Sequence, residues 1–116
     1  MKTEPTTVLP ETEQAIERIK EIVAFEYGLS VVMLESSERK EPLPMIRHVA
    51  MALCYELVEH ANLKVITSFF NCTSHQTVLH AIQQTRSRCD ISPAFKARVE
   101  RVKAAVVAAL AAKGKS

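Results

Sequence analysis

A twelve-residue stretch, residues 71–82 (NCTSHQTVLHAI), constrains the fold of this chain more than any other. Its first three residues predict a turn, because Asn tolerates unusual backbone angles and Thr hydrogen-bonds its own backbone. Ser74 or Thr73 then stands where a side-chain oxygen caps a helix by accepting a hydrogen bond from a free backbone N–H. A second short helix is predicted just upstream, over residues 63–70. Two helices joined by a polar turn are typical of a helix-turn-helix, a unit that reads DNA.

The side chains of the second predicted helix divide between two faces. The apolar face holds Val78, Leu79 and Ile82, and the polar face holds Gln76, His80 and Gln83. His75 and Gln76 stand in the first turn, which is the part of a helix-turn-helix that enters the major groove. We therefore expect these two residues to read bases. The alternative is that both simply solvate the start of a helix.

The rest of the chain predicts an all-α fold. Gly occurs only twice, and Ala, Leu, Glu, Lys and Arg are abundant, which favours helices. The spacing of apolar residues predicts four helices besides the two above, over residues 11–27, 31–35, 45–59 and 94–112. No strand-like alternation is long enough to compete. The expectation is a bundle of about six helices in one domain over residues 11–112, preceded by a flexible arm over residues 1–10.

Several classes of protein are excluded by what the sequence lacks. No run of 18 apolar residues is present and no signal peptide pattern opens the chain, so we expect no membrane partner. The three cysteines have no paired close spacing, which indicates a reduced cytoplasmic setting. If the helix-turn-helix binds DNA, the protein is expected to be associated with the nucleoid. Neither a metal-ligand spacing nor a nucleophile with its base is found. We therefore expect no metal, no cofactor and no catalysis.

The charges are unevenly distributed along the chain. Residues 1–63 carry six Lys/Arg against eleven Asp/Glu, whereas residues 64–116 carry nine against two. A polyanion is attracted to the second half and repelled by the first. The alternative is that the basic side chains merely solvate the last helices.

The last predicted helix has an unusual second half. Its apolar stripe consists of Phe95, Val99, Val102, Val106 and Leu110, at spacings close to a heptad. Beyond Lys103 the helix is apolar on nearly every face, which is uncommon for a solvated helix end. It either packs back on the helix of residues 11–27 or docks on a second copy or a partner. A monomer or a weak dimer is expected.

Three segments resemble the C-terminal DNA-binding domain of the DnaA family of bacterial replication initiators. They are the run VAMALCYEL at residues 49–57, Phe70, and SHQTVLHA at residues 74–81, which is similar to the family signature GRDHTTVLHA. IVAFEYGLS at residues 22–30 is similar to the family's IVAEYFGVS. The resemblance covers roughly residues 14–103. It implies a helix-turn-helix bundle related to the Trp repressor, acting as a stand-alone DNA-binding module in replication initiation or its regulation.

The resemblance also implies which residues contact duplex DNA, with DnaA-box-like sites as the expected target. The family's minor-groove arginine matches Arg39, and a second family arginine matches Arg47. The family's DHTT residues, which enter the major groove, become residues 74–77, where Thr77 keeps the position expected to touch phosphate. The candidate DNA-contacting residues are Arg39, Lys40, Arg47, His48, Lys64, Ser74, His75, Gln76, Thr77 and His80.

Two departures from the family pattern favour a different function. Glu38 and Glu41 flank the basic pair of the loop, and Ser74 replaces an aspartate whose charge would face a cytosine amino group. The alternative function is a regulator that contacts DnaA or its inactivating partner, with DNA binding weakened or lost. A ligand-gated repressor is a third class, because the Trp repressor has a related architecture, but no polar pocket residues single it out.

Overall fold

The computed structural model describes residues 9–36, 38–72 and 74–114, and within them it contains six helices and no strand. In chain order they are α1 (Pro10–Glu26), α2 (Val31–Glu35), α3 (Leu43–Leu57), α4 (Leu63–Phe69), α5 (His75–Ile91) and α6 (Pro93–Gly114). The expected all-α fold is thus confirmed, and the five helices whose bounds were predicted begin and end within two residues of those bounds. Helix α1 begins at the last residue of the predicted arm, and residues 1–8 of that arm lie outside the described residues.

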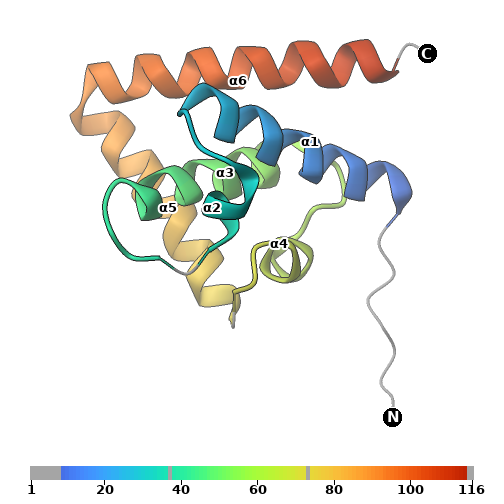
Figure 1. Ribbon diagram of the computed structural model, residues 1–116, viewed down its shortest axis with the longest axis horizontal. Helices are drawn as coiled ribbons and strands as arrows, with labels where there is room; N and C mark the ends of the chain where they lie inside the picture. Colours follow the sequence, from blue (N-terminus) through green and yellow to red (C-terminus); the bar gives the residue numbers. More distant parts are fainter. Residues whose placement is uncertain (1–8, 37, 73, 115–116) are drawn as a thin grey trace.

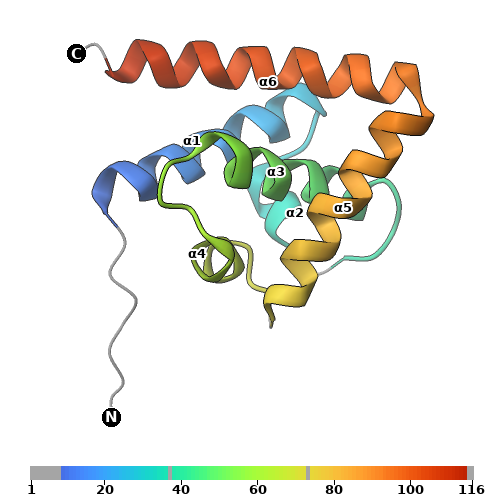
Figure 2. The ribbon, with the colours of Figure 1, turned by 180° about the vertical axis from the view of Figure 1, so that it is seen from behind.

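Helix α3 runs through the middle of the molecule. It packs against α5 on one side and α1 on the other, while α6 crosses one end of the molecule and α4 lies at the opposite end (Figures 1 and 2). Apolar residues buried in the core include Ile16, Ile19, Val23, Leu34, Ile46, Val49, Leu53, Ile66, Val78, Val102 and Val106. All six helices therefore contribute to one core, and α6 is part of it.

Local chemistry sets the ends of several helices. Gly28 takes the left-handed conformation after α1, with φ 73°, and the N–H of Leu29 donates to the carbonyl of Ala24 at 2.7 Å. This Schellman arrangement satisfies carbonyl groups that the end of a helix leaves free. Ser30 caps α2 by accepting from the N–H of Met33 at 3.2 Å. Ser92 caps α6 in the same way, by accepting from the N–H of Phe95.

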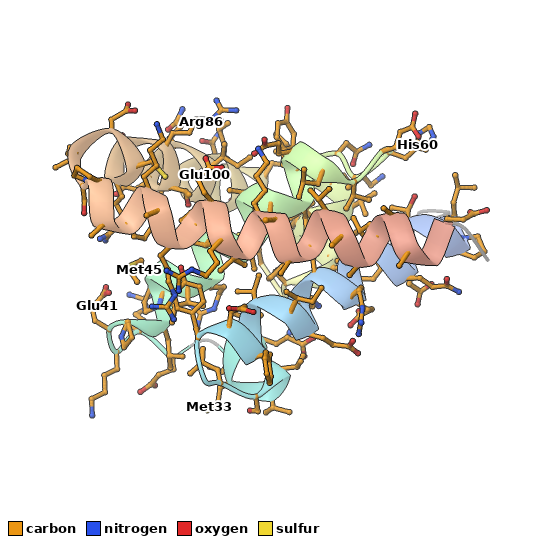
Figure 3. The ribbon with its side chains drawn as sticks, turned by 90° about the horizontal axis from the view of Figure 1, so that it is seen from above. Met33, Glu41, Met45, His60, Arg86 and Glu100 are labelled. Carbon is orange, nitrogen blue, oxygen red and sulfur yellow. The ribbon has the colours of Figure 1, made fainter. Side chains whose placement is uncertain are left out.

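The second half of α6 packs back on the same molecule. Figures 1 and 3 show α6 lying along α1, with Val106 completely buried and Leu110 packed against the core. Arg98 joins the start of α6 to the end of α1, because its guanidinium donates to the carbonyl of Glu26 at 2.8 Å. Of the two options that the sequence leaves open, the structure shows the intramolecular one.

One expected core residue of α5 is not in the core. Leu79 is 38% exposed, whereas Val78 is completely buried and Ile82 nearly so. The buried stripe of α5 continues instead through Ala81 and Thr85. Positions 78, 81, 82 and 85 follow the helical repeat and form one buried stripe. Leu79 lies beside this stripe, because each residue turns the helix by about 100°. Assigning Leu79 to the packed face was therefore wrong.

None of the helices in the described part of the chain is both long enough and apolar enough to cross a membrane.

Candidate nucleic-acid interface

Helices α4 and α5 form the helix-turn-helix. Asn62 starts α4 by accepting from the N–H of Val65 at 3.0 Å. After α4 ends, Phe70 is buried and Asn71 takes the left-handed conformation with φ 57°, as a turn residue of this type does readily. The N–H of Cys72 then donates back to the carbonyl of Thr67 at 3.1 Å. The turn thus directs the chain from α4 into the first turn of α5.

Ser74 occupies the position before α5 without capping it. Its backbone is extended, with φ −153° and ψ 159°, but its side chain makes no capping hydrogen bond. The backbone carbonyl of Ser74 instead accepts from the N–H of Thr77 at 3.2 Å. The predicted capping bond of Ser74 was therefore wrong, and the alternative cap, Thr73, lies outside the described residues. The Ser74 side chain is exposed, so its hydroxyl can contact a ligand.

A row of polar side chains projects from the first turns of α5. The row consists of His75, Gln76, Thr77 and His80, and all four are exposed. Val78 stands between them and is completely buried, which fixes the rotation of α5 about its axis. In Figure 2, α4 is seen nearly end-on beside the start of α5, at the end of the molecule away from α6. Lys64, in the first turn of α4, is also exposed.

The loop between α2 and α3 carries Arg39 and Lys40, both exposed. Arg47 lies behind this loop and does not face the solvent freely. Its Nε donates to the carbonyl of Leu34 and its Nη2 to the carbonyl of Glu38, each at 3.0 Å. Burial lowers the pKa of Arg47. Arg47 therefore links α2 to the loop that contains Arg39.

Two of the candidate histidines lie against each other although they are 32 positions apart in the sequence. The ring centroids of His48 in α3 and His80 in α5 are 5.8 Å apart, and the rings meet edge to face at 89°. His48 is half-buried. Burial lowers the pKa of His48, and the nearby side chains of His80, Arg47 and Arg88 lower it further.

The family model described as the bacterial dnaA protein helix-turn-helix matches residues 16–85, which is more than half of the chain. The chain belongs to this family. DnaA, the chromosomal replication initiator protein of Mycoplasma capricolum subsp. capricolum, is 35% identical to it over 66 residues. These residues are 57% of this chain and 14% of that protein, so the chain spans a small part of the relative it matches. The resemblance to the DnaA family is thereby confirmed.

The DnaA-type domain is a non-catalytic DNA-binding domain, so no residue is assigned to catalysis. The described residues contain no group of three His, Cys, Asp or Glu side chains arranged to hold a metal ion. Cys54 is completely buried, and burial raises the pKa of its thiol to about 12. Such a thiol stays protonated and unreactive at neutral pH.

Sequence reasoning missed Lys20, which supports this DnaA-type helix-turn-helix from behind. Lys20 is 2% exposed. Its ammonium group donates to Glu35 of α2 at 2.9 Å and to the carbonyl of Phe69, the last residue of α4, and lies 4.8 Å from the ring centre of Phe70. A signal was available in the sequence, because Lys20 falls on the apolar stripe of α1 between Ile19 and Val23.

The positive charge of residues 64–116 does not form one surface. Helix α6 carries several of the basic residues, and it crosses the end of the molecule opposite the start of α5 (Figure 1). Lys103 is paired with Glu56, and Arg98 is bound to the end of α1. Fewer cations therefore stand beside the start of α5 than the nine Lys and Arg of residues 64–116 suggest. This limits the number of phosphates that the protein can contact at once.

Proposed function

We propose that this chain binds double-stranded DNA with the first turn of α5 in the major groove and Arg39 in the adjacent minor groove. The target is a DnaA-box-like site, and the role is in replication initiation or its regulation, on the nucleoid. The observation that carries the proposal is the exposed polar row of α5, held in a fixed orientation by buried Val78. Membership of the DnaA helix-turn-helix family supports it.

The exposed row has the chemistry that base reading needs. The side-chain amide of Gln76 both donates and accepts, which matches the N6 and N7 atoms of adenine in the major groove. His75 offers one ring nitrogen as donor or acceptor beside it. Ser74 and Thr77 carry hydroxyl groups that donate to phosphate oxygens, and such contacts fix the register of the protein on the duplex.

The groups that flank α5 supply attraction that does not depend on sequence. Lys64 stands exposed at the start of α4, and Arg39 and Lys40 stand exposed in the loop. A narrow minor groove attracts an arginine because its negative potential is enhanced. Glu38 and Glu41 are exposed in the same loop and weaken this attraction. Arg47 contributes indirectly, by anchoring the loop through two backbone carbonyls.

The deciding experiment is a binding titration of the full chain against a DnaA-box duplex and a scrambled duplex at two salt concentrations. Each neutralised phosphate contributes about −0.9 to the slope of log K against log salt. Because the cations beside α5 are few, we expect a slope of roughly −3 to −5 and tighter binding to the box. Binding that does not respond to salt, or no binding to either duplex, contradicts the proposal.

A specific observation supports the second candidate, a regulator that contacts DnaA or its inactivating partner. Phe25 at the end of α1 is 79% exposed and Val32 in α2 is 76% exposed, with Met33 also exposed beside Val32. Large apolar side chains that are left exposed to water are a feature of protein contact surfaces. Calorimetric titration with purified DnaA in the absence of DNA tests this function. Phe25→Ser with Val32→Ser should abolish the heat of binding while leaving duplex affinity unchanged.

A further inference from the structure

The contact between His48 and His80 joins α3 to the outer face of α5. His80 is exposed and belongs to the polar row, whereas His48 is half-buried behind it. Among the described residues, neither imidazole ring forms a hydrogen bond with another side chain or with the backbone. Both rings therefore keep nitrogen atoms available to a ligand that reaches them from the solvent side of α5.

The surroundings of His48 are predominantly positive. Arg47 of the same helix and His80 and Arg88 of α5 all face it, and each disfavours a charge on its ring. The only carboxylate among these neighbours is Glu41, in the loop before α3, and its effect is the weakest. Figure 3 shows Glu41 near the start of α3, together with Met45. Gathering like charges costs free energy in the unbound protein, and an anion relieves that cost when it binds.

We propose that His48 and His80 together bind one phosphodiester group of the DNA backbone, and that this binding takes up a proton at His48. The inference rests on the proposed function, because the phosphate is part of the duplex that α5 reads. It adds a shared, proton-linked phosphate contact beside the base-reading turn. Arg88 stands about two helical turns beyond His80 on α5, and Arg47 directly precedes His48 on α3.

The direction of the pH effect follows from the charges. In the free protein the pKa of His48 is lower than that of an ordinary histidine, so the ring is neutral at pH 7. A phosphate beside the ring favours the charged form and raises this pKa. When the pH lies between the pKa of His48 in the free protein and its pKa in the complex, binding takes up a proton. Affinity for DNA therefore increases as the pH falls. One fully linked proton changes the affinity by at most about tenfold per pH unit.

The experiment measures duplex affinity of the full chain from about pH 8 to about pH 5.5 at fixed ionic strength, together with the NMR titration of the histidine ring protons. The variants are His48→Gln and His80→Gln. His60→Asn is the matched control, because His60 is exposed in the turn after α3 with φ 70°, a conformation that Asn also adopts readily. We expect the wild type and His60→Asn to bind several-fold more tightly at the lower pH. His48→Gln should remove most of this dependence and His80→Gln should reduce it.

A duplex affinity that is independent of pH, or a pH dependence that His48→Gln leaves intact, overturns the inference and leaves the proposed function standing. Absence of duplex binding at every pH overturns the proposed function instead. In that case a titration with inorganic phosphate tests whether His48 and His80 form an anion site without DNA. Movement of the ring resonances of both His48 and His80 supports an anion site, and movement of neither overturns it.

Discussion

Lys20 of α1 and Glu35 of α2 form an ion pair in which the ammonium nitrogen and a carboxylate oxygen lie 2.9 Å apart, with the lysine almost completely buried. The same ammonium donates to the backbone carbonyl of Phe69 at the end of α4. A cation is favoured there, because the end of a helix carries partial negative charge. The Lys20 side chain thus connects α1 and α2 to the end of α4, the first helix of the helix-turn-helix.

Lys20→Ala should therefore destabilise the domain strongly. Removing one partner of a fully buried pair costs about 3–5 kcal/mol. The cost here should lie at or below the lower end of that range, because Glu35 is 32% exposed and water partly compensates its charge. The matched control is Arg18→Ala, which breaks an ion pair with Glu21 whose two side chains are half-exposed and which is worth about 1 kcal/mol or less. Chemical denaturation of both variants measures the difference. Equal costs would show that the buried pair contributes no more than the surface pair.

Gln76→Ala should relax sequence specificity while leaving non-specific affinity nearly unchanged. A bidentate contact to adenine discriminates by about 1–3 kcal/mol. The control is Gln83→Ala, because Gln83 is exposed on the same helix about two turns further from the start. The ratio of affinities for a DnaA box and a scrambled duplex is the measurement. If Gln76→Ala weakens both duplexes equally, the side chain only positions the protein.

Replacing Glu38 and Glu41 together by Gln should tighten DNA binding. Both carboxylates stand exposed beside Arg39, and removing them strengthens the attraction of the loop for the minor groove. The double variant Glu11→Gln with Glu13→Gln changes the net charge equally, on the first turn of α1. A gain in affinity confined to the loop variant is the expected result. The same gain in both variants would reveal a general charge effect and no approach of the loop to DNA.

Val106→Ala and Val107→Ala should differ sharply although the residues are neighbours in α6. Val106 is completely buried, whereas Val107 is 46% exposed. Burying a valine side chain contributes about 1.5–3 kcal/mol, so Val106→Ala should lower the melting temperature by several degrees. Val107→Ala should change stability by about 0.5 kcal/mol or less. A mass by light scattering that stays the same in both variants would agree with packing inside one molecule.

Cys54 should resist thiol reagents in the native state. Its thiol is fully buried and its pKa is raised to about 12, so the reactive thiolate is absent near neutral pH. Cys72 and Cys89 are partly exposed and should react slowly, since burial raises the pKa of both thiols. Counting alkylated cysteines by mass spectrometry before and after denaturation checks this. Native labelling of Cys54 at the rate of Cys89 would contradict the packing of α3.

The features that the sequence predicts correctly are those with local causes. Gly28, Ser30 and Ser92 end or start helices through contacts within a few residues, so their neighbours in the sequence are sufficient to recognise them. The exposed row of α5 could be placed for the same reason, since a helical repeat separates it from Val78 and Ile82.

The features that the sequence did not predict depend on which elements meet in space. The hydrogen bonds of Arg47 are one example, because the fold brings the carbonyls of Leu34 and Glu38 to its guanidinium. The contact of His48 with His80 depends in the same way on how α3 packs against α5. Helical spacing alone contains no information about either arrangement.

The bond between Arg98 and Glu26 spans 72 positions of the chain. The family match ends at residue 85, yet Val102 and Val106 of α6 are completely buried in the core. During synthesis the chain emerges from its N-terminus, so α1, α3 and α5 leave the ribosome while the apolar surface that α6 covers is still open. The helix-turn-helix is thus synthesised before the helix that covers part of its core, and the core stays open to water until α6 has followed.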